Sequence, residues 1–537
     1  RTPRTMKSSD MDLSKTTSGV AEGKGKLRGP SFAPLTKDLL SSYKSRVKIL
    51  RLLLLLVSPL AYLDSNFGNE RPNILIVLAD DLGYGDIGCY DNEIVHTPHL
   101  DQFAKEGIRF TDCYSAAPNC SPARAGLMTG RIPWRIGIHN WIPMMSPMHL
   151  RKSEITIASL LRDSGYETCH SGKWHLNGYF NLPGQPQPDD HGFDHWFSVQ
   201  NNALPNHRNP YNFVRNGVPL GEIEGYSADI VTAEAVSWLR KGRDPKNPFF
   251  LFLCYHEPHE PIATAEHHTR HYAHLEDPAE QALWGNITQL DAAFGLLLSE
   301  LETLGLRENT LVFFTSDNGP ALTGKHPYGS AGPLRAKKGH VRDGGIRVPG
   351  ILRWPGRATA GVDISEPIGG VDWLPTLCEV AGVSLPADRT LDGTSLLPLL
   401  ENREIERSTP LYWQFFRAKG SVKVATREGD WKLVARIDRP EMKPSGGITA
   451  EDIEFNRNAQ LVDFELFQLR EDVSEEVDRS ASEPERFEAM KKRLLTLFED
   501  VREESPVWPE WEFPRYEGLR IEWPEYTALR RPPMYED

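Results

Sequence analysis

Three continuous apolar runs are the feature of this sequence that most constrains its fold. They lie far apart along the chain, at residues 73–79 (NILIVLA), 248–253 (PFFLFL) and 310–315 (TLVFFT). An apolar run without polar alternation is typical of a strand buried on both faces, as in parallel sheets covered by helices. Segments with helical patterns separate the runs, at 155–162, 230–239 and 290–304. The sequence therefore predicts an α/β domain with a large, mixed but mostly parallel sheet flanked by helices.

Each apolar run leads into polar residues able to carry chemistry: Asp80 and Asp81 after the first, His256 and His259 after the second, and Asp317 and Asn318 after the third. Taken alone, the aspartate segments are equally typical of ordinary turns. The carboxyl ends of parallel strands meet at one edge of a sheet, where α/β proteins bind ligands, so we expect the segments to converge. Three aspartates and an asparagine supply the hard oxygen ligands that Ca²⁺ or Mg²⁺ prefers. The sequence predicts a divalent-cation site at this edge.

The segment 120–131 (CSPARAGLMTGR) combines a thiol, a helix-starting proline and a cation. Pro122 suits the first position of a helix, so we expect Cys120 just outside a helix N-terminus, where unpaired N–H groups favour an anion. Arg124 falls about one turn further along and can direct its guanidinium toward the same anion. The segment predicts a nucleophile that attacks an anionic substrate.

The pattern Cys120-x-Pro122-x-Arg124, followed by two apolar residues and Thr129-Gly130, resembles the signature of the type I sulfatases. In that family the cysteine is oxidised after synthesis to Cα-formylglycine. The resemblance implies an alkaline phosphatase-like fold, hydrolysis of sulfate monoesters, and a partner enzyme of the formylglycine-generating or anaerobic sulfatase-maturating type. The implied ligands of one Ca²⁺ are Asp80, Asp81, Asp317, Asn318 and the modified Cys120.

Three further segments resemble family elements, in the expected order. Gly172-Lys173-Trp174-His175 is similar to the element whose lysine contacts sulfate and whose histidine contacts the aldehyde hydrate. The segment 256–259 (HEPH) is similar to a second histidine site, in which His259 takes the role by spacing. The segment 334–349 resembles the element with a second sulfate-binding lysine, here Lys338. The family commonly has Tyr-Glu where this sequence has Arg342-Asp343, which keeps the acid and puts the packing of the loop in doubt.

The resemblance also implies a reaction sequence. Cationic side chains neutralise the sulfate, one hydroxyl of the aldehyde hydrate attacks sulfur with help from Asp317, and His259 protonates the leaving alcohol. His175 then accepts the proton of the second hydroxyl as sulfate is eliminated and the aldehyde returns. The implied catalytic residues are Cys120, Arg124, Lys173, His175, His259 and Lys338.

Composition narrows the classes of partner. The chain has 61 Lys and Arg against 74 Asp and Glu, a formal net charge of −13, which argues against a nucleic-acid partner. The six cysteines have neither zinc-ligand nor disulfide-framework spacing, so most are predicted to be buried free thiols. A pairing of Cys89 with Cys113 is left open.

The N-terminal region differs from the rest of the chain. Residues 1–47 are polar and rich in Lys and Ser, which predicts disorder. A basic flank then precedes the apolar run 52–63, which is too short to span a bilayer comfortably and resembles a secretory signal. We expect an exported protein, periplasmic, secreted or lumenal, with no stable transmembrane anchor. The alternative is that the run is a buried helix of the folded domain.

The C-terminal region has a different pattern. Short alternating or aromatic runs at 410–415, 422–426 and 431–434 predict a small antiparallel sheet. A strand at 465–469 and a helix at 484–501 follow, as in the sulfatase C-terminal subdomain, and the tail from Pro506 is expected to wrap the surface. The predicted divisions are an extension with a signal segment (1–70), a catalytic domain (71–400) and a C-terminal subdomain with its tail (401–537).

The substrate is the least constrained part of the interpretation. Aromatic and amide residues near 139–141 and 201–209 suit a sugar ring, and ordinary loop packing explains them equally well. Trp141, Asn202 and His256 are the candidate substrate-binding residues, and a carbohydrate sulfate is the expected substrate. The alternatives are a phosphodiester or phosphonate monoester hydrolase of the same superfamily, or a non-catalytic binder of sulfated glycans with an unmodified Cys120.

Overall fold

The structure is a computed structural model that describes residues 71–442, 445–515 and 517–529. The polar extension and the apolar run at 52–63 lie outside the described residues. Their predicted disorder and signal function therefore stay predictions.

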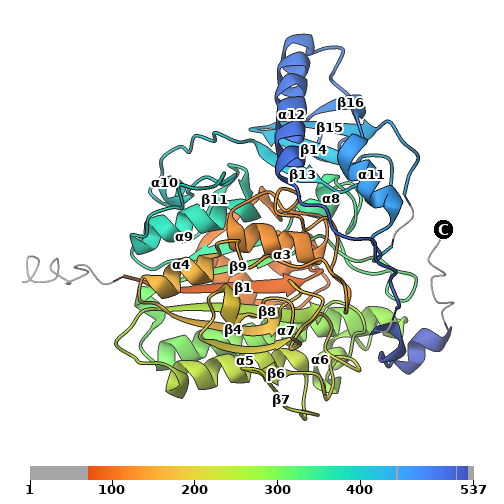
Figure 1. Cartoon of the computed structure of the whole chain (residues 1–537). Helices are drawn as coiled ribbons and strands as arrows, with labels where there is room; N and C mark the ends of the chain where they lie inside the picture. The colour runs from red at the N-terminus through yellow and green to blue at the C-terminus, as the bar shows by residue number, and fades with distance from the viewer. Residues whose placement is uncertain (1–70, 443–444, 516, 530–537) are drawn as a thin grey trace, which may run out of the picture. The chain divides into compact units, whose positions relative to one another are not determined.

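A mixed sheet forms the core of the described chain (Figure 1). Its ten strands, in spatial order, are β11 (Val362–Ile364), β2 (Ile108–Phe110), β10 (Gly350–Arg353), β9 (Thr310–Ser316), β1 (Asn73–Asp80), β8 (Phe249–Pro258), β4 (Glu167–Lys173), β5 (His195–Val199), β6 (Val214–Arg215) and β7 (Val218–Pro219). The central strands from β9 to β5 run parallel, whereas β10 and β6 run antiparallel to them. This confirms the predicted mixed, mostly parallel sheet.

The three apolar runs are neighbours in the middle of this sheet. β1 lies between β8 and β9, with Val77 opposite Leu253 on one side and Phe314 on the other. Every residue of the three strands is buried, as expected for strands covered on both faces. Because the strands run parallel and in register, the polar residues after them meet at one edge.

Helices cover both faces of the sheet. Alternate β1 side chains such as Ile76 pack with α3 (Cys120–Thr129), α4 (Ile157–Asp163) and α9 (Trp373–Ala381). The intervening side chains such as Val77 pack with α2 (Pro98–Lys105), α5 (Ser227–Ser237) and α7 (Pro278–Thr303). Figure 1 shows α3, α4 and α9 on one side of the strands, and α5 and α7 on the other. The three predicted helical segments correspond to α4, α5 and the second half of α7.

A second, smaller sheet follows in the chain. It is antiparallel, as predicted, and its strands in order are β13 (Leu411–Gln414), β14 (Val424–Glu428), β15 (Trp431–Ile437) and β16 (Leu461–Gln468). Side chains from α11 (Ala450–Asn458) and α12 (Pro484–Glu504) pack on one face of it, including Phe455 and Phe498. The helix α11 has no counterpart among the predicted elements. The division at residue 400 stays a prediction.

The remaining strands and α-helices are short: β3 (Cys113–Tyr114), β12 (Ile368–Gly369), α6 (Glu266–Thr269), α8 (Asp343–Ile346) and α10 (Leu397–Leu400). Cys89 and Cys113 are both free thiols, which settles the pairing that the sequence left open. Among the described residues, no helix combines the length and apolar character needed to cross a membrane.

Candidate active site

The first component of the site is the N-terminus of α3. Cys120 is the first residue of this helix, and the Asn119 side chain accepts a hydrogen bond from the Cys120 N–H. The helix therefore begins two residues earlier than the position of Pro122 suggested. The first-turn N–H groups of a helix have no intrahelical partners, so proline is tolerated at several first-turn positions and does not mark the start uniquely. Gly130 ends the helix with a positive φ of 66°, a conformation that glycine adopts without strain.

The second component is formed by the ends of β1 and β9. Asp80 is the last residue of β1, and Asp81 follows in the left-handed region with φ 68°, which aspartate tolerates better than most residues. Asn318, which follows β9, donates from Nδ2 to Asp81 Oδ1 at 2.7 Å. Possible metal-ligand atoms of Asp80, Asp81, Cys120 and His259 all lie within 4.8 Å of one another. The polar segments predicted to converge thus lie together.

Three cations pair with the three aspartates. Arg124 donates to Asp317 Oδ2 from Nε at 3.0 Å and from Nη2 at 2.8 Å. Lys173 Nζ lies 2.6 Å from Asp80 Oδ2. Lys338 Nζ lies 2.5 Å from Asp81 Oδ1 and 3.5 Å from Cys120 Sγ. The positive groups therefore surround the Cys120 end of α3, where the helix itself also favours an anion.

Burial and charge set the protonation of these groups. Burial raises the pKa of the Cys120 thiol to about 12, although Lys173 and Lys338 oppose the shift, so the thiol is protonated at neutral pH. Burial and then the nearby Asp80 raise the pKa of Asp317 to about 6. Burial opposes the ionisation of Asp81, but Lys338 and His259 hold its pKa well below the usual range. An unmodified cysteine here is a poor nucleophile, since only the thiolate attacks effectively.

Two histidines complete this group. His259 Nε2 lies 3.6 Å from Asp81 Oδ2, and its Nδ1 lies 2.5 Å from the Glu260 carbonyl oxygen. His175 is 1% exposed, adopts a positive φ of 58°, and has no hydrogen-bond partner at Nδ1 among the described residues. Burial lowers the pKa of both imidazoles, that of His259 to about 3. Both rings are therefore neutral in this arrangement.

The three candidate substrate-binding residues lie in different surroundings. Trp141 packs edge-on against Phe513 of the C-terminal tail, with ring centroids 5.1 Å apart. Asn202 is buried, and its backbone N–H donates to Glu517. His256 is 1% exposed on β8, and neither ring nitrogen has a hydrogen-bond partner among the described residues. Their roles stay predictions.

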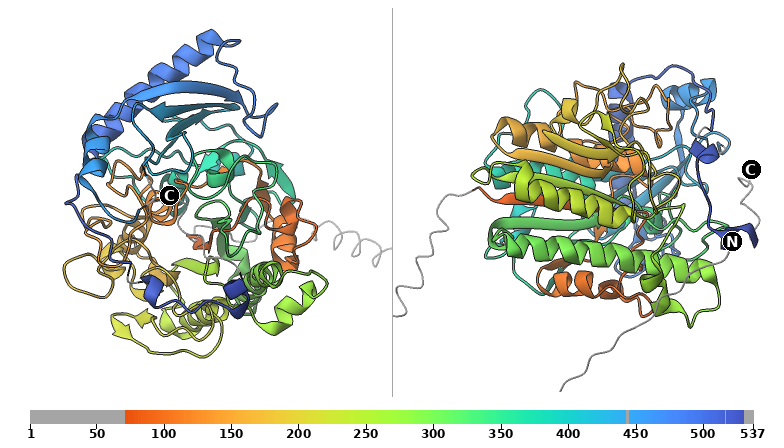
Figure 2. Two further views of the ribbon diagram at one scale, coloured as in Figure 1. Left: turned by 90° about the vertical axis from the view of Figure 1, so that its right-hand side faces the viewer. Right: turned by 90° about the horizontal axis from the view of Figure 1, so that it is seen from below.

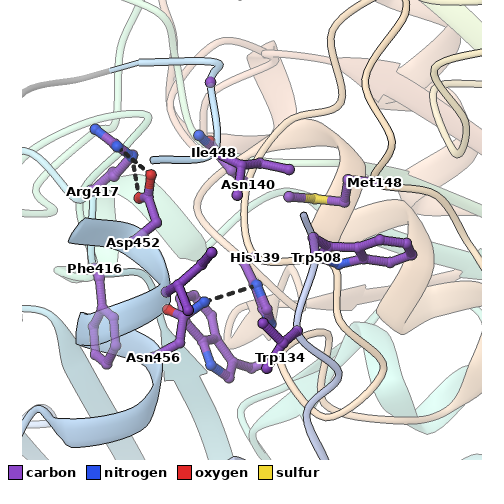
Figure 3. Close-up of a pocket in the computed structure, with 13 residues that line it drawn as sticks. Trp134, His139, Asn140, Met148, Phe416, Arg417, Ile448, Asp452, Asn456 and Trp508 are labelled. Atoms are coloured by element: carbon purple, nitrogen blue, oxygen red, sulfur yellow. Dashed lines mark hydrogen bonds and ion pairs between the residues drawn. The ribbon is translucent and has the colours of Figure 1, made fainter. Parts of the chain in front are cut away.

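A cavity of about 30 Å³ lies near the loop that carries Trp141 (Figure 3). His139 lines it, stacks on Trp134 with ring centroids 4.4 Å apart, and accepts from Asn456 Nδ2 at 3.2 Å. The cavity has room for only a few water-sized molecules. His139 thus contributes to packing between α11 and the loop before Trp141.

The unusual Arg342-Asp343 pair is accommodated by the small sheet. Asp343 accepts from Lys432 Nζ and from the Tyr114 hydroxyl, each at 2.6 Å. Arg342 lies over the Phe467 ring, 4.8 Å from its centroid, and pairs with Glu465 at 2.5 Å. The charge that replaces an aromatic residue is therefore stacked and paired, and the loop that carries Lys338 is tied to the C-terminal sheet.

Comparison with known proteins identifies the family. The Sulfatase family model matches residues 72–383, which is more than half of the chain and contains all ten strands of the large sheet. The chain belongs to the sulfatase family. A second model, N-sulphoglucosamine sulphohydrolase, C-terminal, matches residues 336–503.

This sulfatase has similar relatives of several kinds. It is 31% identical over 496 residues to N-acetylgalactosamine-6-sulfatase of Sus scrofa, covering 84% of this chain and 90% of the relative. It is 32% identical to steryl-sulfatase of Rattus norvegicus, covering 65% of this chain and 74% of the relative. Arylsulfatase A of Homo sapiens is 35% identical, over 61% of this chain and 68% of the relative. The resemblance to type I sulfatases is confirmed, and the chain is a sulfuric ester hydrolase.

Solved structures agree with this assignment. The crystal structure of Ps i-CgsB in complex with k-i-k-neocarrahexaose matches with a TM-score of 0.70 and 28% identity, over 84% of this chain and 97% of that chain. A phosphonate monoester hydrolase of Agrobacterium radiobacter, with 20% identity and a TM-score of 0.55, shares the fold. The α/β prediction of an alkaline phosphatase-like fold is therefore confirmed.

Proposed function

We propose that this sulfatase hydrolyses sulfate monoesters of carbohydrates, with a formylglycine made from Cys120 and one Ca²⁺ held by Asp80, Asp81, Asp317 and Asn318. The observation that carries the proposal is the arrangement around Cys120. Three cations, the N-terminus of α3 and a cluster of acidic side chains meet at this residue. Such a centre suits an ester with one negative charge spread over three oxygens.

The oxygen atoms of the acidic cluster fit a hard divalent cation. Asp80 Oδ1 and Asn318 Oδ1 are buried and have no hydrogen-bond partner among the described residues. Buried polar oxygens without a donor are rare and costly, and a cation relieves that cost. Carboxylate and amide oxygens are the ligand types that Ca²⁺ accepts, and Cys120 would add an oxygen once it is converted to formylglycine.

When bound, Ca²⁺ polarises a sulfate oxygen, and the formylglycine hydrate supplies a hydroxyl nucleophile in place of the protonated thiol. The chain's own residues do the remaining work. Arg124 and the two lysines neutralise the sulfate oxygens and leave the sulfur open to attack. Asp317 orients Arg124 through two hydrogen bonds and is available as a base beside position 120.

The histidines have the proton-transfer roles in this proposal. The Glu260 carbonyl holds the proton of Nδ1, so Nε2 is the nitrogen that faces the reaction. His259 takes up a proton on Nε2 when the anionic substrate binds and passes it to the oxygen of the leaving alcohol, which returns the ring to its neutral form. His175, whose Nδ1 has no hydrogen-bond partner among the described residues, accepts a proton during sulfate release. Both roles require an imidazole that changes charge during turnover, and burial, with a smaller contribution from the nearby lysines, lowers the pKa of both rings and disfavours a permanent imidazolium.

Relatives support the carbohydrate part of the proposal. One relative is named for N-acetylgalactosamine 6-sulfate, and Ps i-CgsB was solved with a neocarrahexaose. A steryl-sulfatase and an arylsulfatase are also similar to this chain, so similarity alone does not select the substrate class. The experiment below therefore compares sugar and aryl sulfates directly.

The deciding experiment uses protein co-expressed with a formylglycine-generating enzyme, and peptide mass spectrometry verifies the aldehyde at position 120. Sulfate release is measured from sulfated sugars and 4-nitrophenyl sulfate, with and without Ca²⁺, beside phosphate diesters and a phosphonate monoester. Ca²⁺-dependent release from sugar sulfates is expected. Faster phosphodiester or phosphonate turnover would establish the alternative hydrolase, and sugar binding without turnover by converted protein would establish a glycan binder.

Export and maturation by a partner enzyme belong to the same proposal. The basic flank and the apolar run at 52–63 support a secretory signal. Expression in a secreting host followed by N-terminal sequencing tests this, and we expect the mature protein outside the cytoplasm to begin after residue 63.

A further inference from the structure

The C-terminal tail after α12 follows the end of the large sheet at which the candidate active site lies. The left view in Figure 2 shows this tail, in dark blue, running along the rim of that end of the molecule. Trp508 Nε1 donates to the Gly137 carbonyl at 2.6 Å near its start. Further along the tail, the Glu522 N–H donates to the Pro205 carbonyl at 3.0 Å, and Lys325 lies over the Trp523 ring. The tail thus contacts three separate segments, one that follows α3 and two that follow the strands β5 and β9.

Glu517 is the tail residue with the most specific contacts. It begins a short 3₁₀ helix (Glu517–Leu519), and its carboxylate accepts from Asn201 Nδ2 at 3.2 and 3.0 Å and from the Asn202 N–H at 3.3 Å. These distances are long for hydrogen bonds to a charged group, which are usually about 2.7–2.9 Å. Two donors also do not saturate a carboxylate, which offers about four acceptor positions. The carboxylate therefore keeps capacity for further donors.

Asn201, which contacts Glu517, and its sequence neighbour Gln200 also have unused acceptors. Gln200 Nε2 donates to two backbone carbonyls, which leaves Oε1 as an acceptor with no hydrogen-bond partner among the described residues. Asn201 Nδ2 donates to Glu517, and its Oδ1 is likewise buried without a donor. A buried acceptor without a donor costs about 1–3 kcal/mol, so neighbouring acceptors of this kind indicate a place for a donor-bearing ligand.

This group of acceptors adjoins the active-site residues. The His175 N–H donates to the Gln200 carbonyl at 2.7 Å, so the end of β5 and the Lys173–His175 segment are directly paired. Burial raises the pKa of Glu517, and Asn201 together with the Lys173 charge opposes that shift. The cations that favour a sulfate group therefore lie next to acceptors that favour hydrogen-bond donors and disfavour a second anion.

We propose that Glu517, Gln200 and Asn201 form an acceptor site for hydroxyl or amine groups on the sugar ring that carries the sulfate ester. The inference rests on the proposed sulfatase activity and extends it to substrate selection. The carboxylate of Glu517 favours a neutral or amino sugar monosulfate and disfavours a ring with a second anionic group. The tail is thus a specificity-determining part of the enzyme.

The test compares Glu517→Gln with the matched control Glu522→Gln. Both remove one negative charge from the same tail, but the Glu522 side chain is exposed and only its backbone contacts Pro205 and Asn206. We measure kcat/KM for N-acetylgalactosamine 6-sulfate, for D-glucosamine 2-N,6-O-disulfate and for 4-nitrophenyl sulfate. Glu517→Gln is expected to lower kcat/KM for the neutral sugar by about tenfold, since a hydrogen bond to a charged group is lost. It should raise the disulfate-to-monosulfate ratio and leave the aryl sulfate unchanged.

Three outcomes would overturn the inference. An equal loss on all substrates would indicate only a structural role, and a gain on all of them would indicate a tail that blocks the site. A change matched by Glu522→Gln would indicate only long-range charge.

A binding experiment separates this inference from the proposed function. Affinity for N-acetylgalactosamine 6-sulfate is measured by calorimetry on Cys120→Ala protein with and without Glu517→Gln, so no turnover is needed. Weaker sugar binding by the double variant, with unchanged binding of inorganic sulfate, supports the acceptor site. Equal sugar binding overturns it whether or not the enzyme is active.

Discussion

The Lys338 ammonium lies 2.5 Å from an Asp81 carboxylate oxygen, within the same cluster that contains Cys120. One cation therefore connects a proposed metal ligand to the residue proposed to become the nucleophile. The Lys338 loop is in turn tied to the C-terminal sheet through Asp343 and Lys432. The candidate active site and the small sheet are thus linked by charge pairs.

Replacing Cys120 by Ala should abolish turnover and leave the fold intact. The side chain is buried but small, and its loss removes one sulfur atom from the start of α3. Sulfate release is measured together with thermal unfolding. The control is Cys378→Ala, a buried free thiol on α9, which should keep full activity. Full activity of the Cys120→Ala protein would refute the proposed nucleophile.

Asp80→Asn should remove most of the stabilisation by Ca²⁺. A ligand that binds only the folded protein stabilises it, by about 2.7 kcal/mol at a hundredfold excess over Kd. We expect added Ca²⁺ to raise the Tm of the unaltered protein, chelation to reverse the effect, and the variant to respond much less. Asp363→Asn serves as control, because this carboxylate pairs with Arg109 and is 53% exposed. An equal Ca²⁺ response in both variants would place the ion elsewhere.

His259→Ala should affect poor leaving groups more than good ones. A sugar alcohol needs protonation as it leaves, whereas 4-nitrophenolate departs without it, so general-acid catalysis worth about 10²–10⁴-fold applies mainly to the sugar. The rates on both substrates are compared for each variant. The control is His195→Gln, because His195 is the first residue of β5 and the candidate site lies beyond the last residues of the parallel strands. A uniform loss on both substrates would argue that His259 only positions other groups.

Lys432→Met should destabilise the protein in a pH-dependent way. Lys432 is fully buried and lies 2.6 Å from Asp343 and 3.0 Å from Glu475, so its removal leaves two buried carboxylates and costs about 3–5 kcal/mol at neutral pH. Burial acts to raise the pKa of Asp343, but Lys432, Arg347 and Arg427 outweigh burial and lower this pKa to about 2. A depressed carboxyl pKa contributes stability above the unfolded value near 4, which is lost as the pH falls toward 2.

The variant should therefore differ from the unaltered protein most at pH 7 and less at pH 5, since a buried carboxylate without its cation takes up a proton more readily. Urea unfolding at the two pH values measures this. Lys152→Met, whose partner Asp190 lies at the surface, should change nothing measurable. An equal penalty at both pH values would show that Lys432 acts by packing alone, and a penalty that grows toward acid pH would contradict the charge argument.

Sequence patterns predicted the centre of the large sheet well and its neighbours poorly. β1, β8 and β9 are apolar throughout, so their burial on both faces is readable from composition. β4 is equally central, but its sequence ETCHSGK has no apolar run, and only its pairing with β8 and β5 makes it a strand. Polar strands of this kind are stabilised by their neighbours, which local patterns do not reveal.

The site shows the same division. Local motifs predicted the residues around Cys120, because helix starts, strand ends and charged side chains leave short-range signals. Glu517 has no such signal, since one glutamate in a tail rich in Trp, Pro and Glu is indistinguishable from its neighbours. Its contacts with Asn201 and Asn202 join positions more than 300 residues apart.

The sequence by itself determined the α/β class, the order of the chemical groups and the family. These properties depend on hydrophobic runs and short motifs, which are local. Only the tertiary structure decided which cation pairs with which aspartate, that Arg342 is stacked and paired, and that the tail reaches residues next to the candidate active site. Such contacts depend on how distant segments pack, and the free energy that selects them comes from burial and charge pairing across the whole fold.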